Sequence, residues 1–398
     1  MSYEKWTEEL KANFDETVAW RRHLHEYPEP SYEEKQTAAF IVAQLQQMGI
    51  EDIQTNVGNG YGIVAKIYGD HSGPTIAFRA DFDALRIHEE TDVPFQSKNP
   101  GIMHACGHDG HTASLLSVAK VLSKNKADLH GNVVLLHQNA EEVVPGGAKS
   151  MIEAGCLMGV DYIFGIHVMS DLEAGKIAYC QSYGSAGSDS FQMQIQGKGG
   201  HGAAPHTTVD SVMIGTQIVT TLQTLVSRQV DPVQPAVLTF SGFQAGGEAN
   251  NIIADKAVLR GTIRTLNPEI RDLMETQVKQ MSQSIAAVNQ GSVEIRYTRG
   301  YPSIMNTPLE TKRLTKVMQE KFGEAEVFEV ESGMGGEDFA YYLQEKPGTF
   351  FYVGAKNAAI GANYPHHHPK FKIDETALLH SGEAFLAIAE DYLLKTAD

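Results

Sequence analysis

The order of apolar runs along the chain constrains its fold more than any other feature. In the first half, short apolar runs alternate with longer segments in which apolar residues recur at helical spacing. The expected helices cover residues 4–26, 30–49, 109–122 and 147–154, and the expected strands cover residues 62–68, 75–80, 132–137 and 162–167. Strands that alternate with helices predict an α/β layered domain with a largely parallel or mixed sheet.

The pattern changes after Tyr183 and returns after Pro302. Between them we expect strands at 191–196, 236–243, 252–265 and 293–298 and helices at 210–228 and 268–288. The order strand, helix, strand, strand, helix, strand is that of the ferredoxin-like split motif. A helix from Thr307, a strand at 349–353 and a helix at 375–394 then resume the first pattern. We therefore expect an α/β domain of residues 1–183 and 300–398, interrupted by an inserted α+β domain of residues 184–299.

Charge and composition narrow the class of protein. The 398 residues include 32 Lys and Arg against 49 Asp and Glu, which gives a formal net charge of −17. Nucleic acids and anionic membranes bind basic surfaces, so neither is an expected partner. The N-terminal segment lacks the apolar core of a secretory signal, and no apolar run is long enough to span a membrane. The three cysteines, Cys106, Cys156 and Cys180, are too few for a disulfide framework, so we expect a cytoplasmic protein with reduced thiols.

A cluster of metal-binding residue types lies between the strand at 75–80 and the helix from Asp109. Four candidate donors fall within six residues: His104, Cys106, His108 and Asp109. Cys, His and Asp are side chains that bind divalent transition metals, and the two glycines of this segment, Gly107 and Gly110, allow the backbone to bend around an ion. A single helical histidine is more often packed or solvated than a ligand, but four close donors favour a metal site. In open α/β sheets such loops gather at the carboxyl ends of strands.

Three further regions supply candidate donors. The apolar strand at 133–137 is followed by Glu141 and Glu142, and adjacent carboxylates point to different sides of the chain. One can therefore bind a metal while the other acts as a general base, although an isolated Glu-Glu pair is usually solvated. His167 ends the apolar run at 162–167, and three consecutive histidines occupy positions 366–368. We expect at least one of these three to face a metal.

Seven segments occur in one order across nearly the whole chain: RADFDAL (79–85), MHACGHDGHT (103–112), NAEE (139–142), GIHV (165–168), GKGGHGAAPH (197–206), GEDFAYY (336–342) and HHPKF (367–371). Together they resemble the dinuclear metal amidohydrolase and metallopeptidase family of aminoacylases, hippurate hydrolases and auxin-conjugate hydrolases, relatives of glutamate carboxypeptidase. The resemblance implies a metallopeptidase-type catalytic domain with a mixed sheet. It also implies that the inserted domain is a lid and dimerisation domain.

Carried over by motif, the resemblance implies two divalent ions per subunit and five metal ligands: Cys106, His108, Glu142, His167 and His367. In the family's arrangement Cys106 bridges the ions, with Glu142 and His367 on one and His108 and His167 on the other. His367 is chosen among the three histidines because the family's ligand lies two residues before the proline, here Pro369. Such a mixed donor set accepts Zn, Mn, Co or Ni.

Other roles also follow from the resemblance alone. Glu141 matches the general base, and Asp81 and Asp338 match acids that orient ligands. His201, on the inserted domain, matches a histidine that reaches across a dimer interface to polarise the scissile carbonyl. Asn251 and Arg264 match residues that hold the substrate carboxylate, although a surface salt bridge is the alternative for Arg264. A homodimer is therefore implied.

The expected activity is metal-dependent hydrolysis of N-acyl amino acids, with a metallopeptidase acting on short peptides as the alternative. Arg86, Asn139 and Gly336 stand where the family has Pro, Pro and Ser, and these departures weaken any transfer of substrate identity. A metal storage protein is a rival from another class, but storage has no use for an unliganded carboxylate beside a liganded one. Nucleophilic catalysis by Cys106 is a weak rival, because a thiolate that coordinates two ions loses nucleophilicity.

Overall fold

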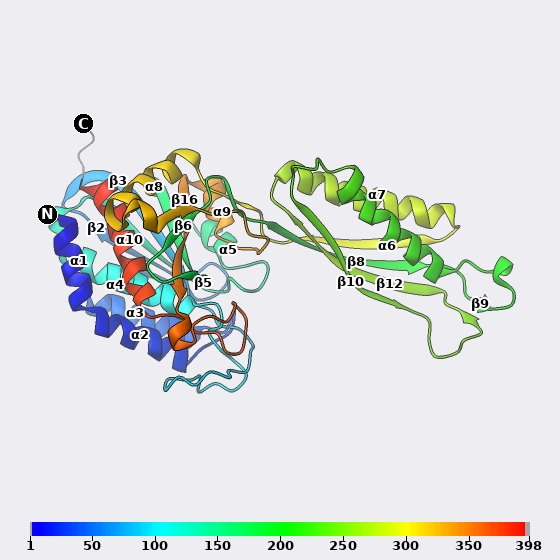
Figure 1. The fold of residues 1–398 in the computed structure, drawn as a ribbon, viewed down its shortest axis with the longest axis horizontal. Helices are drawn as coiled ribbons and strands as arrows, with labels where there is room; N and C mark the ends of the chain where they lie inside the picture. The colour runs from blue at the N-terminus through cyan, green and yellow to red at the C-terminus, as the bar shows by residue number, and fades with distance from the viewer. Residues whose placement is uncertain (1, 395–398) are drawn as a thin grey trace. The chain divides into compact units, whose positions relative to one another are not determined.

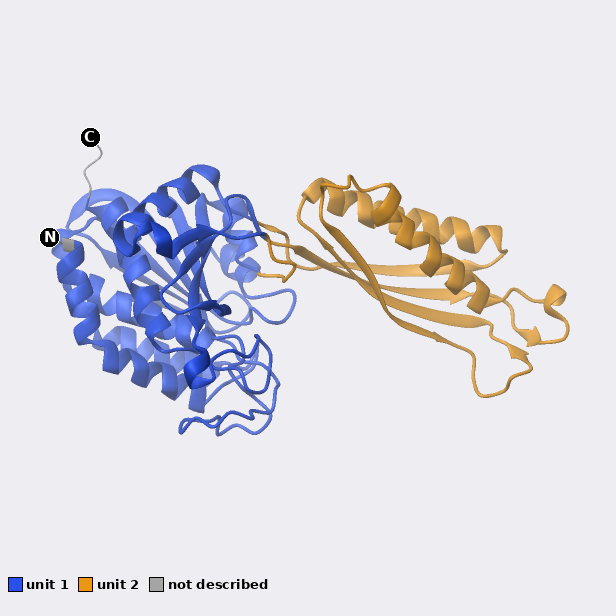
Figure 2. Cartoon of the chain, in the orientation of Figure 1, with its two compact units in different colours: residues 1–184, 305–331, 338–398 blue, residues 185–304, 332–337 orange. Residues whose placement is uncertain are grey.

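The structure, a computed structural model, describes residues 2–394, and these divide into two compact units (Figure 2). Unit 1 comprises residues 1–184, 305–331 and 338–398, and unit 2 comprises residues 185–304 and 332–337. The chain passes between them at the short strands β7 (Tyr183–Ser185) and β14 (Ile304–Met305). The segment 332–337, which the sequence places in the resumed α/β pattern, clusters with unit 2.

Unit 1 is built on an eight-stranded mixed sheet with the order β1-β2-β4-β3-β5-β16-β6-β15. The strands are β1 (Asp52–Val57), β2 (Gly62–Tyr68), β3 (His71–Asp81), β4 (His130–Gln138), β5 (Tyr162–Glu173), β6 (Ile177–Tyr179), β15 (Val327–Glu329) and β16 (Gly348–Lys356). The central strands β4, β3, β5 and β16 run parallel, whereas β2 pairs antiparallel with β4. The carboxyl ends of the parallel strands therefore meet at one edge, and the predicted mixed α/β sheet is confirmed.

Helices cover this sheet (Figure 1). They are α1 (Ser2–Ala12), α2 (Phe14–Glu26), α3 (Lys35–Gln47), α4 (His108–Lys124), α5 (Ala148–Glu153), α8 (Pro308–Phe322), α9 (Ala340–Glu345) and α10 (Thr376–Leu393). Helix α4 is buried along most of its length, and α10 packs on it and on β3. The rings of Phe78 on β3 and Phe385 on α10 lie 4.7 Å apart. This packing holds the start of α4 rigidly at the edge where the parallel strands end.

Unit 2 has the ferredoxin-like topology that the sequence predicts. Its elements are β8 (Gly187–Gln196), β9 (Gly200–His201), α6 (Ser211–Arg228), β10 (Ala236–Ala245), β11 (Ile252–Ile253), β12 (Lys256–Thr265), α7 (Pro268–Val288) and β13 (Ser292–Arg299). The antiparallel sheet has the order β10-β12-β8-β13, and α6 and α7 cover one of its faces (Figure 1). Asp210 and Asn267 cap the two helices by accepting bonds from their first backbone N–H groups, as their residue types favour.

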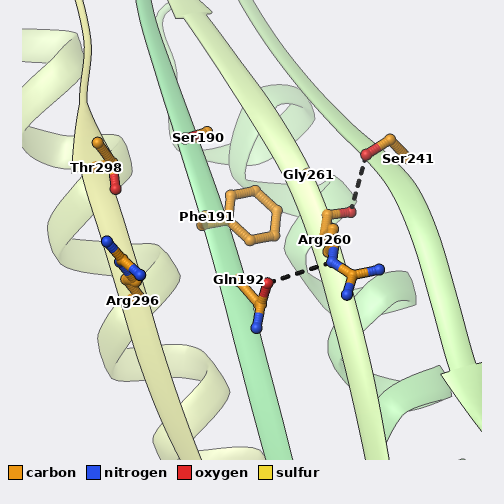
Figure 3. A pocket seen from close by; sticks show the side chains of 8 residues that line it. All are labelled: Ser190, Phe191, Gln192, Ser241, Arg260, Gly261, Arg296 and Thr298. Carbon is orange, nitrogen blue, oxygen red and sulfur yellow. Dashed lines mark hydrogen bonds between the residues drawn. The ribbon is translucent and has the colours of Figure 1, made fainter. Parts of the chain in front are cut away.

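The opposite face of the unit 2 sheet carries a shallow hollow (Figure 3). It is lined by Ser190, Phe191, Gln192, Ser241, Arg260, Gly261, Arg296 and Thr298. Arg260 bonds Gln192 through its Nε at 3.2 Å, and Figure 3 shows Arg296 on the neighbouring strand β13. The hollow contains no carboxylate, thiol or imidazole among its lining residues, so it offers no donor set for a transition metal.

Several expected boundaries are wrong. The helix expected at 4–26 is broken at Asn13, whose side-chain amide bonds the carbonyl of Glu9 at 2.8 Å and competes with the helical pattern. The second helix begins at Lys35, because Pro30 forms a parallel bridge to Ala84 and Tyr32 adopts a φ of 68°. The strand expected at 252–265 is two strands, and the short strands β1, β6 and β15 were not expected. None of the described helices combines the length and hydropathy that a membrane crossing requires.

Candidate metal centre

The predicted donors of unit 1 gather where the parallel strands end. Cys106 lies directly before α4 and His108 begins it. Glu141 and Glu142 follow β4, and His167 lies on β5 just beyond its pairing with β3. His367 comes from the loop before α10. The loops therefore bring residues that are 261 positions apart in the sequence into one pocket.

The donor atoms form two groups that share one thiol. One group is Cys106, His108 and His167, and the other is Cys106, Glu142 and His367. Within each group all ligand atoms lie within 4.8 Å of one another. The Cys106 Sγ is 3.5 Å from His167 Nε2, and His367 Nε2 is 3.2 Å from Glu142 Oε1. A thiol flanked by two sets of harder donors suits a pair of transition-metal ions.

Hydrogen bonds orient the imidazoles of His108, which is buried, and His167, which is partly buried, for metal binding. His108 Nδ1 lies 3.0 Å from the Asp83 carbonyl and 3.2 Å from its carboxylate, so this nitrogen donates. His167 Nδ1 likewise donates to the Val168 carbonyl at 2.8 Å. The Nε2 atom of each ring is therefore the one turned toward Cys106, and His108 Nε2 has no hydrogen-bond partner among the described residues. This is the arrangement in which a ligating histidine is held by its other nitrogen.

Carboxyl groups at the centre favour protonation of its other donors. Burial lowers the pKa of His108, but Asp81, Asp83 and Glu142 outweigh this effect and raise it to about 10. Burial and the neighbouring Glu142 and Glu141 raise the pKa of the Cys106 thiol well above its usual value. Protons therefore occupy Cys106 and His108 in the metal-free protein, and a divalent cation would displace them. The residues present thus fit a dinuclear metal site.

The three consecutive histidines have different environments. His366 Nε2 accepts a bond from the Ser170 backbone N–H at 3.3 Å, and His368 Nδ1 accepts from the Lys370 N–H at 3.0 Å. His367 has a φ of 65°, which turns its ring toward Glu142. Only His367 of the three belongs to a donor group among the described residues.

Asp83 is a functional residue that the sequence reasoning missed. Besides His108, its carboxylate accepts bonds from the Glu142 backbone N–H at 3.0 Å and the Ser31 hydroxyl at 2.6 Å. It therefore contacts one proposed ligand from each donor group. The signal was present in the RADFDAL segment, where Asp83 lies two residues after Asp81.

Asp81 and Asp338 belong to neither thiol-centred donor group and bond instead to residues that surround those groups. Asp81 accepts from His111 Nδ1 at 2.6 Å, while His111 Nε2 accepts from the Val168 N–H at 2.9 Å. Arg79, fully buried, bridges the carboxylates of Asp81 and Asp338 at 2.5 and 2.9 Å. This network ties the end of β3 to the β5 backbone beside His167. Removing one partner of such a buried pair is strongly destabilising.

His104 and Asp109, two of the four donors in the Cys106 loop, do not join these groups. Asp109 is bound instead by Arg21 Nε and His25 Nδ1, each at 2.8 Å. His104 is buried, and neither of its ring nitrogens has a hydrogen-bond partner within residues 2–394. Burial lowers its pKa to about 4, so it stays neutral at pH 7.

Glu141 is 6% exposed and lies beside the donors without belonging to either thiol-centred group. One of its carboxylate oxygens lies within 4.8 Å of donor atoms of His108 and Glu142. It follows Ala140, whose φ of 54° turns the chain sharply after β4.

The predicted residues of unit 2 lie at two distant places within that unit. His201 on β9 pairs with Ile252, and the Gly202 N–H bonds the Asn251 carbonyl at 2.7 Å, so His201 and Asn251 are neighbours. Arg264 lies near the other end of β12, opposite Ser188. Eight residues at the usual strand rise separate it from Lys256 by roughly 26 Å. One chain therefore cannot place Arg264 and the His201–Asn251 pair on the same small substrate.

The His201 ring has a defined tautomer. Its Nδ1 accepts a bond from the Ala203 backbone N–H at 3.0 Å, so Nδ1 carries no proton in this state. The neutral ring must then carry its proton on Nε2. The exposed side chain therefore presents an N–H donor, as a group that binds a carbonyl oxygen requires.

Comparison with known proteins gives one family. The model described as "Peptidase family M20/M25/M40" matches residues 77–391. YhaA of Bacillus subtilis is 48% identical over 96% of each chain. An N-acyl-L-amino acid amidohydrolase of Geobacillus stearothermophilus is 43% identical over 75% of this chain and 81% of its own. Thermostable carboxypeptidase 1 of Saccharolobus solfataricus is 40% identical over 93% of this chain and 95% of its own.

A solved structure also matches the whole fold. YXEP of Bacillus subtilis, described as a dinuclear metal-binding peptidase from the M20 family, superposes with a TM-score of 0.80 at 35% identity. The match covers 95% of this chain and 98% of that one. The similarity extends over both units of the chain and not only over the donor pocket.

Cys106→Ser tests the shared thiol. Replacing the thiolate removes a donor common to both groups, so we expect affinity for divalent metal to fall by at least about 10- to 100-fold. Metal content after dialysis, measured by mass spectrometry, checks this. Cys156→Ser is the matched control, because Cys156 is also buried and belongs to no donor group within the described residues. Equal metal retention by the two variants would contradict the assignment.

Proposed function

Because the chain belongs to peptidase family M20/M25/M40, we propose that it hydrolyses the amide bond of N-acyl amino acids, releasing a carboxylic acid and a free amino acid. The observation that carries this proposal is the pocket in which two donor groups share Cys106 while Glu141 stays beside them as an additional carboxylate. The N-acyl-L-amino acid amidohydrolase among the relatives supports the choice of substrate class.

We assign two divalent ions to the pocket. Cys106 would bridge them, with Glu142 and His367 on one ion and His108 and His167 on the other, which agrees with the two donor groups. Zn, Mn, Co and Ni all suit a mixed thiolate, imidazole and carboxylate set. The M20 structure described as dinuclear supports the number of ions.

The protein's own residues would divide the work of hydrolysis. Bound at the centre, the ions supply Lewis acidity that lowers the pKa of a water and polarises the amide carbonyl. Glu141 accepts the proton of the attacking water and then delivers it to the departing amine nitrogen. The Nε2–H of His201 donates to the carbonyl oxygen as negative charge develops there. The Arg264 guanidinium binds the substrate's carboxylate through its planar fork.

The site as proposed needs two copies of the chain. Arg264 and the His201–Asn251 pair lie too far apart along unit 2 to serve one substrate from a single chain. We therefore infer a homodimer formed through unit 2. In it, the partner subunit's His201 and the partner subunit's Asn251 complete each site. This refines the sequence expectation, in which Asn251 and Arg264 hold one carboxylate without regard to chain.

A metallopeptidase acting on short peptides is the second candidate, because a carboxypeptidase is among the relatives and the same water attacks either amide. Nucleophilic catalysis by Cys106 is disfavoured. Burial and Glu142 raise the pKa of this thiol, so without a cation it stays protonated and unreactive.

A substrate panel tests the function. The metal-loaded protein should hydrolyse hippurate or acetylated amino acids with kcat/KM at least about tenfold above that for unblocked dipeptides. The panel should be run with Zn, Mn, Co and Ni in turn, with release of the free amino acid as the measurement. A requirement for a free amino terminus would favour the peptidase and overturn the amidohydrolase proposal.

Glu141→Gln tests the general base. Glutamine keeps the shape of the side chain but accepts no proton, so we expect kcat to fall by about 10²- to 10⁴-fold while metal content is retained. Glu153→Gln on the exposed end of α5 is the control and should leave kcat unchanged. Near-wild-type turnover by the Glu141 variant with full metal content would exclude this role.

Mixing two inactive variants tests the shared site. In a mixed dimer of Glu141→Gln and His201→Ala, one site combines an intact Glu141 with an intact His201 from the partner. Equal mixing after subunit exchange should therefore restore about one quarter of wild-type activity. No recovery, with mixed dimers demonstrated by mass spectrometry, would place His201 outside the partner's site.

A further inference from the structure

The loop of residues 139–142, called here the base loop, carries both Glu141 and Glu142. Its residue Ala140 has a φ of 54°, in the left-handed region that non-glycine residues rarely adopt. Such a conformation persists only where the surrounding structure holds it. The direction of the Glu141 side chain depends on this turn, so the groups that hold Ala140 also determine where the proposed base points.

Glu34 is the side chain that holds the Ala140 amide. Its carboxylate is fully buried, and its Oε1 accepts a hydrogen bond from the Ala140 N–H at 2.8 Å. The Ala140 carbonyl accepts in turn from the Gly147 N–H at 3.1 Å. Both polar groups of this residue are thus engaged, and the bond from Glu34 is the one made by a side chain.

Glu34 does not serve its own helix. It stands directly before α3 but makes no side-chain bond to the first N–H groups of that helix. Glu29 performs this task instead, because its Oε2 accepts from the backbone N–H groups of Gln36 and Thr37 at 2.7 and 2.8 Å. Burying a carboxyl is costly unless it is well bonded. The bond that Glu34 accepts from the Ala140 N–H links this buried carboxyl to the base loop.

The whole segment 29–34 is docked against the proposed centre. The Ala84 N–H bonds the Glu29 carbonyl at 2.9 Å, and the Ser31 hydroxyl bonds Asp83 at 2.6 Å. Asp83 in turn accepts from the Glu142 N–H. Two amides of the base loop are therefore held by carboxylates from two separate parts of the chain. Residues 29–34 lie outside the matched family model, which begins at residue 77.

We propose that Glu34 is a positioning residue for hydrolysis: it holds the Ala140 amide and thereby aims the Glu141 carboxylate. The catalytic consequence rests on the proposed function, whereas the hold on the loop can be measured without any substrate. The side chain needs only an acceptor at this place, so a glutamine can replace it.

Three variants separate positioning from folding. Glu34→Met has a similar volume and no acceptor, and it also removes a buried carboxyl, so the protein should remain folded. Glu34→Gln retains an acceptor oxygen. Glu29→Met is the matched control, because it removes the bonds to α3 and leaves the base loop untouched. For each variant we would measure thermal unfolding, metal content, kcat and KM, and amide hydrogen exchange in a peptide covering residues 139–142.

In Glu34→Met we expect kcat to fall by about 10- to 100-fold, with KM and metal content near wild type and faster exchange in the base loop. Glu34→Gln should recover kcat and slow exchange, and Glu29→Met should lower the unfolding temperature without lowering kcat. Unchanged exchange and kcat in Glu34→Met, or no recovery by Glu34→Gln, would overturn the proposal. If the wild-type chain hydrolyses no amide, the proposed function fails, but hydrogen exchange still decides whether Glu34 holds the loop.

Discussion

The parallel alignment of β4, β3 and β5 is the constraint on which the rest of the site depends. It brings the ends of three strands to one edge, where a thiol and several carboxylates lie close together and are largely shielded from solvent. So much potential negative charge is unfavourable in a medium of low dielectric unless cations or protons compensate it. The neighbouring carboxylates accordingly raise the pKa values of Cys106 and His108. The same alignment places Asp83 and Asp81 behind the donors, where they orient the imidazoles of His108 and His111.

The two units contribute different parts of the proposed chemistry. Unit 1 supplies a preorganised donor set, in which backbone carbonyls and Asp83 fix the tautomers of His108 and His167. Unit 2 supplies polar groups on a stiff antiparallel sheet, at opposite ends of β12. The sheet keeps those groups apart, and this separation is the reason for the homodimer proposed above.

The sequence predicted the fold class and the family because both depend on local signals: the alternation of strands and helices, and short segments in a set order. The same segments named the donors that the structure gathers, and of these Cys106 and His108 lie where a helix begins and Glu142 shortly after a strand ends. What could not be predicted depends on contacts between distant segments. Asp83 bonds the Glu142 amide and Glu34 bonds the Ala140 amide. Each pair is far apart in the sequence, so no local sequence pattern predicts it. The separation of Arg264 from His201 follows from the register in which their strands pair. Short sequence motifs carry no information about that register.

The central claim is that one thiolate is shared by two metal ions. Crystals grown with zinc or manganese and measured at the metal absorption edge would show this directly by anomalous scattering. The account predicts two peaks in each chain, both within bonding distance of Cys106 Sγ, about 2.3 Å for zinc, with Glu141 bound to neither. A single peak, or two peaks of which only one touches Cys106, would contradict it.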